Sequence, residues 1–386
     1  MQPSATLAQE EIFGPVLVSM TFRTPSEAVA LANNSRYGLA ASVWTENVNL
    51  ALDVAPALKA GTVWINCTNQ FDAAAGFGGY RESGFGREGG MEGLYAYVKA
   101  GWTAQLSDQP VYPALKPSAP KESETADSLA SIDRTAKLYI GGKQQRPDGG
   151  YTIVQYDVDG FPAGEVPEGN RKDLRNAVEA AVNSPGWTRT TAHNRAQVLY
   201  YIAENLGARS EDFARRLAAL SGQSPEASMA EMERCVQRIF SAAAMADKFD
   251  GRVHATPMRN VTLAMNEPLG VLGIVAPEEA GFIGFLSTIM PALAMGNRVV
   301  VVPSLRYALL ATDFYQVLDT SDLPAGALNI VTGRQDELLP HLAGHMGLEG
   351  LWYWVDKAGS RLVEELSAET LKRTWVSQGR YHDCFD

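Results

Sequence analysis

Cysteine is scarce in this chain: its 386 residues contain three, Cys67, Cys235 and Cys384. No two of them form a Cys-x-x-Cys pair. Three thiols also cannot build the disulfide framework on which small secreted domains depend. The low cysteine content therefore excludes a disulfide-rich scaffold and a cysteine-based zinc site.

Positive charge is also in short supply. Lys and Arg together number 33 against 44 Asp and Glu, which gives a formal net charge of −11, and no run of basic residues occurs. A protein that binds the phosphate backbone needs a basic surface. We therefore expect no nucleic acid partner.

The chain lacks a long apolar run. The longest apolar stretches, residues 282–293 and 299–302, are too short or too interrupted to cross a bilayer. Residues 1–8 have neither the basic start nor the apolar centre of a secretory signal. The sequence thus predicts no membrane association and a cytoplasmic location.

The composition is that of a globular protein, with 46% hydrophobic and 20% charged residues, and the length exceeds that of one typical domain. Residues 106–135 contain four prolines, few aromatic residues and no periodicity, which is typical of a linker. A long surface loop is the alternative. We predict one domain over residues 1–105, a linker over 106–135 and a second domain over 136–386.

Local patterns predict several elements of secondary structure. Helix-forming residues after Pro25 predict a helix that begins near Ser26. Apolar periodicity predicts a second helix over residues 47–58 and a short strand over residues 62–66. The glycine-rich residues 76–90 predict an irregular loop held by close backbone contacts. From about residue 260 onward, strands alternate with helices, which predicts a doubly wound parallel sheet.

An acidic pair followed by Phe-Gly-Pro stands out near the start, where residues 9–16 read Gln-Glu-Glu-Ile-Phe-Gly-Pro-Val. An aromatic side chain can cover a flat ring and a carboxylate can hold two sugar hydroxyls, so the pattern is typical of the rim of a cofactor pocket. Residues 34–40, 61–66 and 78–89 add three further segments. In order and spacing, the four segments resemble the end of the catalytic domain of the aldehyde dehydrogenase superfamily, over residues 1–105.

The rest of the chain resembles the beginning of another aldehyde dehydrogenase unit. Residues 137–143 are similar to the family's first strand, and residues 198–203 to its first long helix. Residues 291–297 resemble a helix that leads into an apolar strand, residues 299–302, which we expect to be buried on both faces. Residues 323–333 resemble the loop and strand that follow.

This order resembles the sixteenth class of aldehyde dehydrogenases, in which a catalytic unit is fused to a second unit without the catalytic cysteine. The implied fold is α/β: a doubly wound, Rossmann-like parallel sheet with flanking helices, plus the tail of a second α/β catalytic domain. The implied reaction of the parent protein is the NAD- or NADP-dependent oxidation of an aldehyde to a carboxylic acid. On this resemblance, the chain is the C-terminal part of such a protein.

The resemblance also implies site residues in the first unit. Glu11 would hold the nicotinamide ribose and Phe13 would shield the nicotinamide ring, whereas Phe71 and Phe77 would line the aldehyde tunnel. The alternative is that these four side chains serve packing or lie exposed, because the chain begins within that unit. Both interpretations stay open at this point.

Functional positions of the family are replaced in the second unit. The asparagine that donates to the oxyanion corresponds to Glu279, which at pH 7 offers only acceptor oxygens and a negative charge. The ribose-binding lysine corresponds to Val302, and the general base to Ser377. The phosphate-binding Phe-Thr-Gly-Ser corresponds to residues 351–356, which contain three bulky aromatic residues and Asp356. None of the cysteines has the family's Gly-Gln-x-Cys surroundings.

His341 and His345 are spaced four apart, which on a helix would place both imidazoles on one face. Zinc needs at least a third protein ligand, and Pro340 and Gly344 weaken a helix at this point. We interpret them as surface histidines and predict no metal site.

Two hypotheses about function follow. In the first, the chain is a non-catalytic structural or oligomerisation module that pairs with a catalytic aldehyde dehydrogenase unit or with itself, as a homo-oligomer, and binds no cofactor alone. In the alternative, residues 1–105 complete an active site whose nucleophilic cysteine lies on another polypeptide. The first rests on the replaced positions, and the second on the presence of Glu11, Phe13, Phe71 and Phe77.

Overall fold

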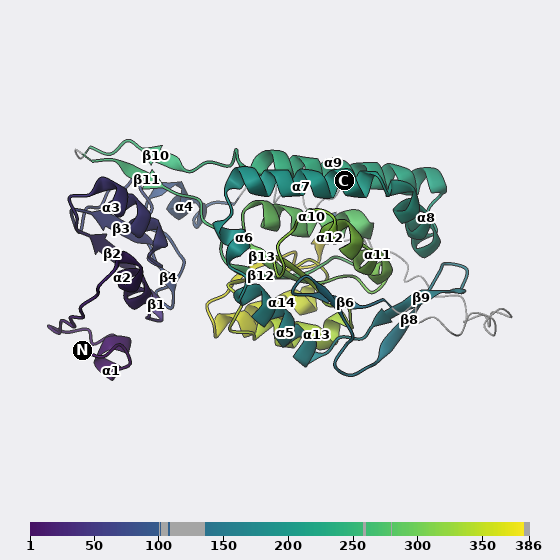
Figure 1. The fold of residues 1–386 in the computed structure, drawn as a ribbon, viewed down its shortest axis with the longest axis horizontal. Coiled ribbons are helices and arrows are strands. Elements are labelled where there is room, and N and C mark those ends of the chain that lie inside the picture. The colour runs from purple at the N-terminus through teal and green to yellow at the C-terminus, as the bar shows by residue number, and fades with distance from the viewer. Residues whose placement is uncertain (100, 102–106, 109–135, 258–259, 279, 382–386) are drawn as a thin grey trace. The chain divides into compact units, whose positions relative to one another are not determined.

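The computed structural model describes residues 1–99, 101, 107–108, 136–257, 260–278 and 280–381 (Figure 1). The chain divides into two compact units. Unit 1 comprises Met1–Ala104 and Gly251–Met265, and unit 2 comprises Gln105–Asp250 and Asn266–Asp386. Apart from residues 107 and 108, the predicted linker lies outside the described residues, so the predicted domain boundaries stay predictions.

Unit 2 consists of a run of strands, a run of helices and, from residue 271 onward, strands that alternate with helices. In chain order its elements are β5 Ser107–Asp108, β6 Leu138–Ile140, β7 Lys143–Gln145, β8 Thr152–Tyr156, β9 Pro162–Pro167, α5 Arg171–Val182, α6 Gly186–Arg189, α7 Ala192–Gly207, α8 Ser210–Ser221, α9 Pro225–Ala246, β12 Val271–Val275, α10 Gly281–Ala294, β13 Arg298–Val302, α11 Ala308–Asp313, α12 Tyr315–Asp319, β14 Leu328–Ile330, α13 Gln335–Ala343, β15 Gly350–Tyr353, α14 Lys357–Ala368, β16 Arg373–Val376 and β17 Arg380–Tyr381.

A seven-stranded sheet forms the centre of unit 2, with the strand order β16-β15-β12-β13-β14-β6-β7. The first five strands in this order are parallel, whereas β6 pairs antiparallel with β14, and β7 antiparallel with β6. Parallel strands need crossover connections, which the helices between them supply. The topology confirms the predicted α/β class and the predicted parallel sheet.

Helices cover both faces of this sheet (Figure 1). Helix α10 packs on one face together with α7 and α9, and α5, α13 and α14 pack on the other. The side chains of β13 alternate between the two cores: Val299 and Val301 belong to one, Val300 and Val302 to the other. All four are buried, as predicted for an apolar strand covered on both faces.

A buried carboxylate holds the start of α10. No side chain at Ala280 caps this helix. Instead, Glu231 of α9 accepts hydrogen bonds from the backbone N–H of Phe282 at 2.9 Å and of Ile283 at 3.3 Å. Gly281 has a φ of 62°, and a Cβ there would lie 2.4 Å from Oε1 of Glu231, so the site requires glycine. Glu231 thus ties the outer helix layer to the helix that covers the sheet.

Unit 1 is a set of short elements. They are α1 Thr6–Gln9, α2 Pro25–Ala32, β1 Tyr37–Gly38, β2 Ala40–Val43, α3 Val48–Val54, the 3₁₀ helix η1 Ala55–Ala57, β3 Thr62–Ile65, β4 Tyr80–Arg81, α4 Gly90–Tyr95, β10 Arg252–His254 and β11 Thr262–Ala264. The sheets in its described residues are all two-stranded: β2 with β3 in parallel, β1 with β4 and β10 with β11 antiparallel.

The described part of unit 1 has almost no apolar core. Ala51 and Leu58 are its buried hydrophobic side chains, and neither core cluster of the molecule includes a residue of this unit. Most of the large hydrophobic side chains that are exposed in the described chain belong to unit 1, although it is the smaller unit. Unit 1 therefore does not bury the surface that normally stabilises a domain.

The local predictions in unit 1 are mostly confirmed. Helix α2 begins at Pro25, one residue before the predicted Ser26, because the hydroxyl of Thr24 accepts a hydrogen bond from Glu27 N–H and caps it. The helix predicted over residues 47–58 is α3 followed by η1, a change of helix type at Pro56, which has no N–H to donate. The expectation that residues 76–90 contain no regular structure is wrong at β4, because two of these residues pair with β1.

Among the residues that the structure describes, no helix combines the length with the apolar character needed to cross a membrane. This agrees with the short apolar runs of the sequence.

We expect Glu231→Ala to lower the free energy of unfolding of unit 2 by about 3 kcal/mol, because it leaves two buried backbone N–H groups without acceptors. Glu231→Gln keeps one acceptor oxygen and should cost less. Chemical denaturation followed by circular dichroism measures both. Glu233→Ala, at an exposed position of the same helix, is the control and should change stability by less than about 0.5 kcal/mol. Equal effects at both positions would contradict the capping role of Glu231.

Candidate functional site

The carboxyl edge of the parallel sheet in unit 2 is the first candidate site. Strand β12 lies between β15 and β13 in the sheet. The chain adds β13 and β14 on one side of β12 and then β15 and β16 on the other side. Ligands of doubly wound folds bind at such a switch point, just beyond the carboxyl ends of the strands. The residues that follow β12, β13 and β15 therefore decide what this edge can bind.

Buried side chains occupy this edge. Val302, at the end of β13, is fully buried, Tyr353 at the end of β15 is 4% exposed, and the following Trp354 is 7% exposed. An isopropyl group offers no hydrogen bond to a ribose. Val302 and Tyr353 pack in one core, and Trp354 packs in the other. The structure places Val302 and the aromatic residues of the predicted stretch at the same edge.

Asp356 caps helix α14 with its own carboxylate. One oxygen accepts a hydrogen bond from Gly359 N–H at 2.7 Å, and the other accepts from the hydroxyl of Tyr353 at 3.1 Å. Burial and the neighbouring carboxylates of Asp356 and Glu278 raise the pKa of Tyr353, which stays a neutral donor. A helix N-terminus is a ready anion site. Here the chain itself supplies the anion.

Two further contacts close the edge beside Asp356. The hydroxyl of Ser304 donates to the carboxylate of Glu278 at 2.6 Å. The side-chain amide of Gln335 donates to the carbonyl oxygens of Ala276 and Pro303, which follow β12 and β13, at 3.0 and 3.2 Å. Polar groups that a ligand would otherwise satisfy thus bond to each other. Glu279, predicted to replace the oxyanion donor, lies outside the described residues.

Ser377, predicted to replace the general base, follows β16. Its backbone N–H donates to the carbonyl of Tyr353 at 3.1 Å, and its hydroxyl accepts from Gly379 N–H at 3.3 Å. A serine hydroxyl in this arrangement is an acceptor within a turn. It cannot take a proton from water at neutral pH.

Three tryptophans form a cluster: Trp352 of β15, Trp354 directly after it, and Trp375 of β16. The ring of Trp375 lies 5.0 Å from that of Trp352 and 4.6 Å from that of Trp354, both edge to face. Sequence reasoning missed Trp375, although two aromatic residues spaced two apart on a strand and a third on the following strand were the available signal. The cluster adds to the side chains that occupy this edge.

The first pair of predicted site residues in unit 1 does not come together. Glu11 lines a cavity of about 420 Å³ that is also lined by Glu10, Tyr37, Lys59 and Ser83. Phe13 is 95% exposed, with a φ of 48°, and it does not line this cavity. The aromatic residue that lines this cavity together with Glu11 is Tyr37, not Phe13.

The second pair does come together. The rings of Phe71 and Phe77 lie 4.9 Å apart, edge to face, and Trp64 lies 5.5 Å from Phe71 and 6.3 Å from Phe77. The indole N–H of Trp64 donates to the carbonyl of Gln70 at 3.0 Å and fixes the ring. Phe71 remains 55% exposed. The three rings form a partly open apolar surface, in which sequence reasoning did not assign Trp64 a role.

The two described cysteines lie in different environments. Cys235 is fully buried in a core, and burial raises the pKa of its thiol well above the usual range. Cys67 is partly exposed and follows Asn66 at the end of β3. Reactive cysteines need a positively charged or dipolar surrounding that lowers the pKa. Cys384 lies outside the described residues.

The two histidines do not share a helical face. Helix α13 ends at Ala343, so His341 lies in its last turn and His345 beyond it, where its Nδ1 accepts from Gly347 N–H at 3.0 Å. The condition for a shared helical face is not met, because the helix ends before Gly344, one of the two residues expected to weaken it. Within the described chain, no group of three or more His, Cys, Asp or Glu side chains could hold a metal ion.

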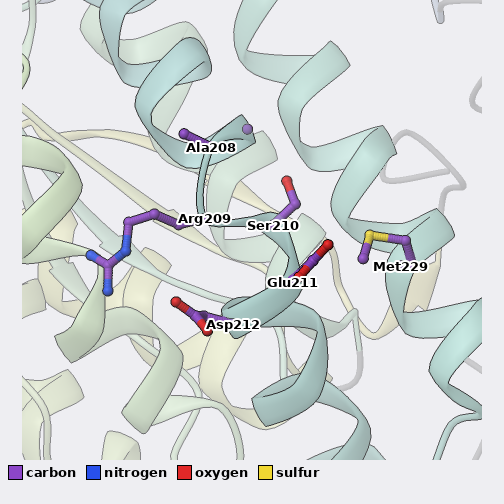
Figure 2. Close-up of a pocket in the computed structure, with 7 residues that line it drawn as sticks. Ala208, Arg209, Ser210, Glu211, Asp212 and Met229 are labelled. Atoms are coloured by element: carbon purple, nitrogen blue, oxygen red, sulfur yellow. The ribbon is translucent and has the colours of Figure 1, made fainter.

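A shallow pocket of about 330 Å³ lies at the turn between α7 and α8, lined by Arg209, Ser210, Glu211, Asp212 and Met229 among others. Figure 2 shows the side chain of Arg209 extending away from Met229. Its guanidinium lies over the ring of Phe213, 5.6 Å from the centroid. The polar side chains of this pocket do not converge on one point, so we do not assign it a function.

The comparisons with known proteins agree with the resemblance. The model of the aldehyde dehydrogenase family matches residues 1–103 and 147–380. Over 104 residues the chain is 53% identical to the putative aldehyde dehydrogenase DhaS of Bacillus subtilis, which covers 26% of this chain and 21% of DhaS. Over 99 residues it is 52% identical to the mitochondrial aldehyde dehydrogenase of Homo sapiens. This match covers 26% of this chain and 19% of the human protein. The chain spans about a fifth of the length of the curated relatives it matches.

Solved structures match a larger part of the chain. An NAD-dependent aldehyde dehydrogenase from Sinorhizobium meliloti matches with a TM-score of 0.60 and 24% identity, over 67% of this chain and 52% of that one. A putative aldehyde dehydrogenase from Burkholderia cenocepacia matches with a TM-score of 0.58 and 28% identity, over 63% of this chain and 52% of that one. Betaine aldehyde dehydrogenase from Staphylococcus aureus, solved with NAD+, matches with a TM-score of 0.60 and 22% identity, over 62% of this chain and 49% of that one.

We expect Asp356→Ala to lower the free energy of unfolding by about 1 to 2 kcal/mol, because α14 loses its N-cap and Tyr353 loses its acceptor. Asp356→Asn, which retains a capping oxygen, should cost only a few tenths of a kcal/mol. Urea denaturation of the three proteins measures the difference. Lys357→Ala, at the next and exposed position, is the control. A loss of stability in Lys357→Ala equal to that in Asp356→Ala would overturn the capping role.

Proposed function

Because the chain belongs to the aldehyde dehydrogenase family, we propose that it is a non-catalytic part of an aldehyde dehydrogenase, with a structural or assembly role. The observation that carries this proposal is the closed carboxyl edge of unit 2. There Asp356 occupies the N-terminus of α14, Ser304 bonds to Glu278, and Gln335 spans the ends of two strands. An edge whose polar groups are satisfied within the chain offers a dinucleotide few partners.

The thiols support the same proposal. Thioester chemistry needs a thiolate of lowered pKa beside an oxyanion donor. Cys235 is buried with a raised thiol pKa, and Cys67 lies at the end of a strand of unit 1. The general base of the family corresponds to Ser377, whose hydroxyl is held in a turn. We therefore assign this chain no catalytic residue.

The activity belongs, on this proposal, to the whole protein of which the chain is part. That protein would oxidise an aldehyde to a carboxylic acid with NAD or NADP as the acceptor. We further propose the two-unit arrangement of the sixteenth class, with unit 1 as the tail of a catalytic α/β domain and unit 2 as the non-catalytic unit. Its partner would be a catalytic aldehyde dehydrogenase unit or a second copy of the chain, in the cytoplasm.

Calorimetry tests the proposal directly. We expect no saturable heat when NAD+ or NADP+ is added to the purified chain up to millimolar concentration, because Val302 and Asp356 replace groups that hold the cofactor in the family. The betaine aldehyde dehydrogenase of Staphylococcus aureus, which was solved with NAD+, is the positive control. Saturable binding at millimolar or lower concentration would refute the closed-edge interpretation. Cooperative thermal unfolding must be shown first, so that absent binding reflects a folded protein.

A second candidate function is complementation, in which unit 1 completes an active site whose cysteine lies on another chain. The observation that favours it is the partly open surface of Trp64, Phe71 and Phe77, which is suited to an apolar substrate. Glu11 and Phe13 would then meet only when the partner is present.

Complementation predicts that NADH forms from a short aldehyde when the chain is combined with an aldehyde dehydrogenase that lacks the matching stretch. Phe71→Ala should lower kcat/KM by about tenfold, because it removes an apolar contact worth roughly 1 to 2 kcal/mol. Phe161→Ala, an exposed position in unit 2, is the matched control. A complex that forms without any NADH production would reject this candidate.

A further inference from the structure

Strand β16 lies at one end of the seven-stranded sheet of unit 2, and strained backbone bounds it. Among the described residues it pairs with β15 alone. Leu371 precedes the strand with a φ of 50°, and Gln378 follows it with a φ of 54°. Residues other than glycine adopt this left-handed conformation at a cost in free energy. An edge strand with a strained residue on either side is therefore easier to detach than a central one.

The turn before β16 is the end of helix α14. The N–H of Lys372 donates to the carbonyl of Ser367 at 3.1 Å, and the N–H of Leu371 to that of Ala368 at 3.3 Å. In this type of helix end the left-handed position normally holds glycine, and here it holds Leu371. The hydroxyl of Ser367 is buried and has no hydrogen-bond partner in the described chain. The turn is thus less stable than a helix end closed by glycine.

The same turn buries an amine. Lys372 is 4% exposed, and its amine donates a hydrogen bond to the hydroxyl of Thr370. A charged ammonium has three N–H groups to satisfy, and lysine is seldom fully buried in folded proteins. Taking the positive charge out of water costs free energy. The closed turn therefore favours the neutral form of this amine.

Two other segments bring charged or titratable groups to Lys372. Glu349, which precedes β15, attracts the ammonium, but its carboxylate also accepts a hydrogen bond from Val271 N–H at 2.7 Å and attracts Arg298. His345 lies beyond the end of α13, and burial together with the charge of Lys372 lowers the pKa of its imidazole. Burial outweighs the attraction of Glu349 and lowers the pKa of Lys372 to about 8, against 10.5 for an ordinary lysine.

We propose that residues 369–376, the turn together with β16, form a pH-sensitive latch, which loosens when the amine of Lys372 gains a proton and closes when it loses one. The direction follows from the two forms of the latch. In the open form Lys372 is in water and keeps its proton up to about pH 10.5, whereas in the closed form it loses the proton near pH 8. Opening therefore takes up a proton between these two values and becomes less favourable as the pH rises.

Opening of the latch changes the carboxyl edge of unit 2. The ring of Trp375 leaves those of Trp352 and Trp354, and the N–H of Ser377 leaves the carbonyl of Tyr353. The edge is then uncovered on the side of β16. The inference goes beyond the proposed function and does not rest on it, because neither a cofactor nor a partner takes part in the opening.

Hydrogen exchange of the full chain tests the latch. We expect the protection factors of residues 373–377, corrected for the intrinsic exchange rate at each pH, to be at least about tenfold higher at pH 9.5 than at pH 7.0. At pH 7.0 they should be at least about tenfold lower than those of residues 271–275, because an edge strand that opens separately exchanges before the centre of the sheet. This pH range lies above the ordinary titration of histidine, so the imidazole of His345 does not contribute.

Lys372→Met keeps the apolar stem of the side chain and removes the charge. It should raise the protection of residues 373–377 at pH 7.0 by at least about tenfold and bring the values at pH 7.0 and pH 9.5 within about threefold of each other. Lys357→Met is the matched control, because Lys357 is an exposed lysine at the start of α14. It should keep the pH dependence of the parent chain.

Leu371→Gly tests the strain separately from the charge. Glycine adopts the left-handed conformation without strain, so protection of residues 373–377 should rise by about fivefold at both pH values, with the pH dependence retained. This variant and the parent chain keep the latch testable where Lys372→Met does not fold.

Three results would overturn the latch. They are protection of residues 373–377 that does not rise with pH in the parent chain, a pH dependence that survives in Lys372→Met, and equal protection of β16 and β12 at pH 7.0. The last result would mean that β16 opens only when the whole unit unfolds. Binding of NAD+ in the calorimetric experiment would refute the non-catalytic proposal and leave each of these three readouts as it is.

Discussion

The burial of the central strands of unit 2 on both faces is the constraint on which the rest of that unit depends. Every side chain of β12 and nearly every one of β13 is enclosed, so helices must cover both faces. Polar chemistry can then occur only where the strands end. A family fold can therefore keep its whole interior while the few residues beyond the strands change, and this combination is found here.

The two units differ in what they leave unsatisfied. In unit 2 the polar groups at the strand ends bond to one another, and two large cores stabilise the sheet. In unit 1 the backbone of residues 16–22 and a row of apolar side chains lack partners within a sheet or a core. The first is a self-contained body, and the second has the character of a piece whose stability comes from a neighbour.

The sequence predicted those features that depend on neighbouring residues or on burial of a whole segment. The strand over residues 299–302 could be predicted because a strand covered on both faces is apolar throughout, and the start of α2 because proline and hydroxyl residues mark helix ends. The cap of α10 could not, because Glu231 precedes Phe282 by 51 positions and no local pattern joins them. Trp375 was missed for the same reason, since its contacts are made across strands.

The candidate site was predicted only as far as the family resemblance reaches. Phe71 and Phe77 meet because the loop between them folds back within one short segment. Glu11 and Phe13 do not meet, although they are two residues apart: Glu11 lines a cavity, whereas Phe13 is almost fully exposed. The replaced positions were visible in the sequence, but the separate hydrogen bonds that Asp356, Ser304 and Gln335 make within the chain required the three-dimensional arrangement.

The carboxylate of Asp356 at the start of α14 has a consequence for how this fold responds to its surroundings. A protein whose helix end waits for a bound anion gains stability by mass action as the concentration of that anion rises. A helix that carries its own anion gains nothing from the ligand and loses nothing when the ligand is depleted. On the proposed function, the stability of unit 2 would be independent of the concentration of nicotinamide nucleotides, so the unit would remain folded whether or not a catalytic partner is active.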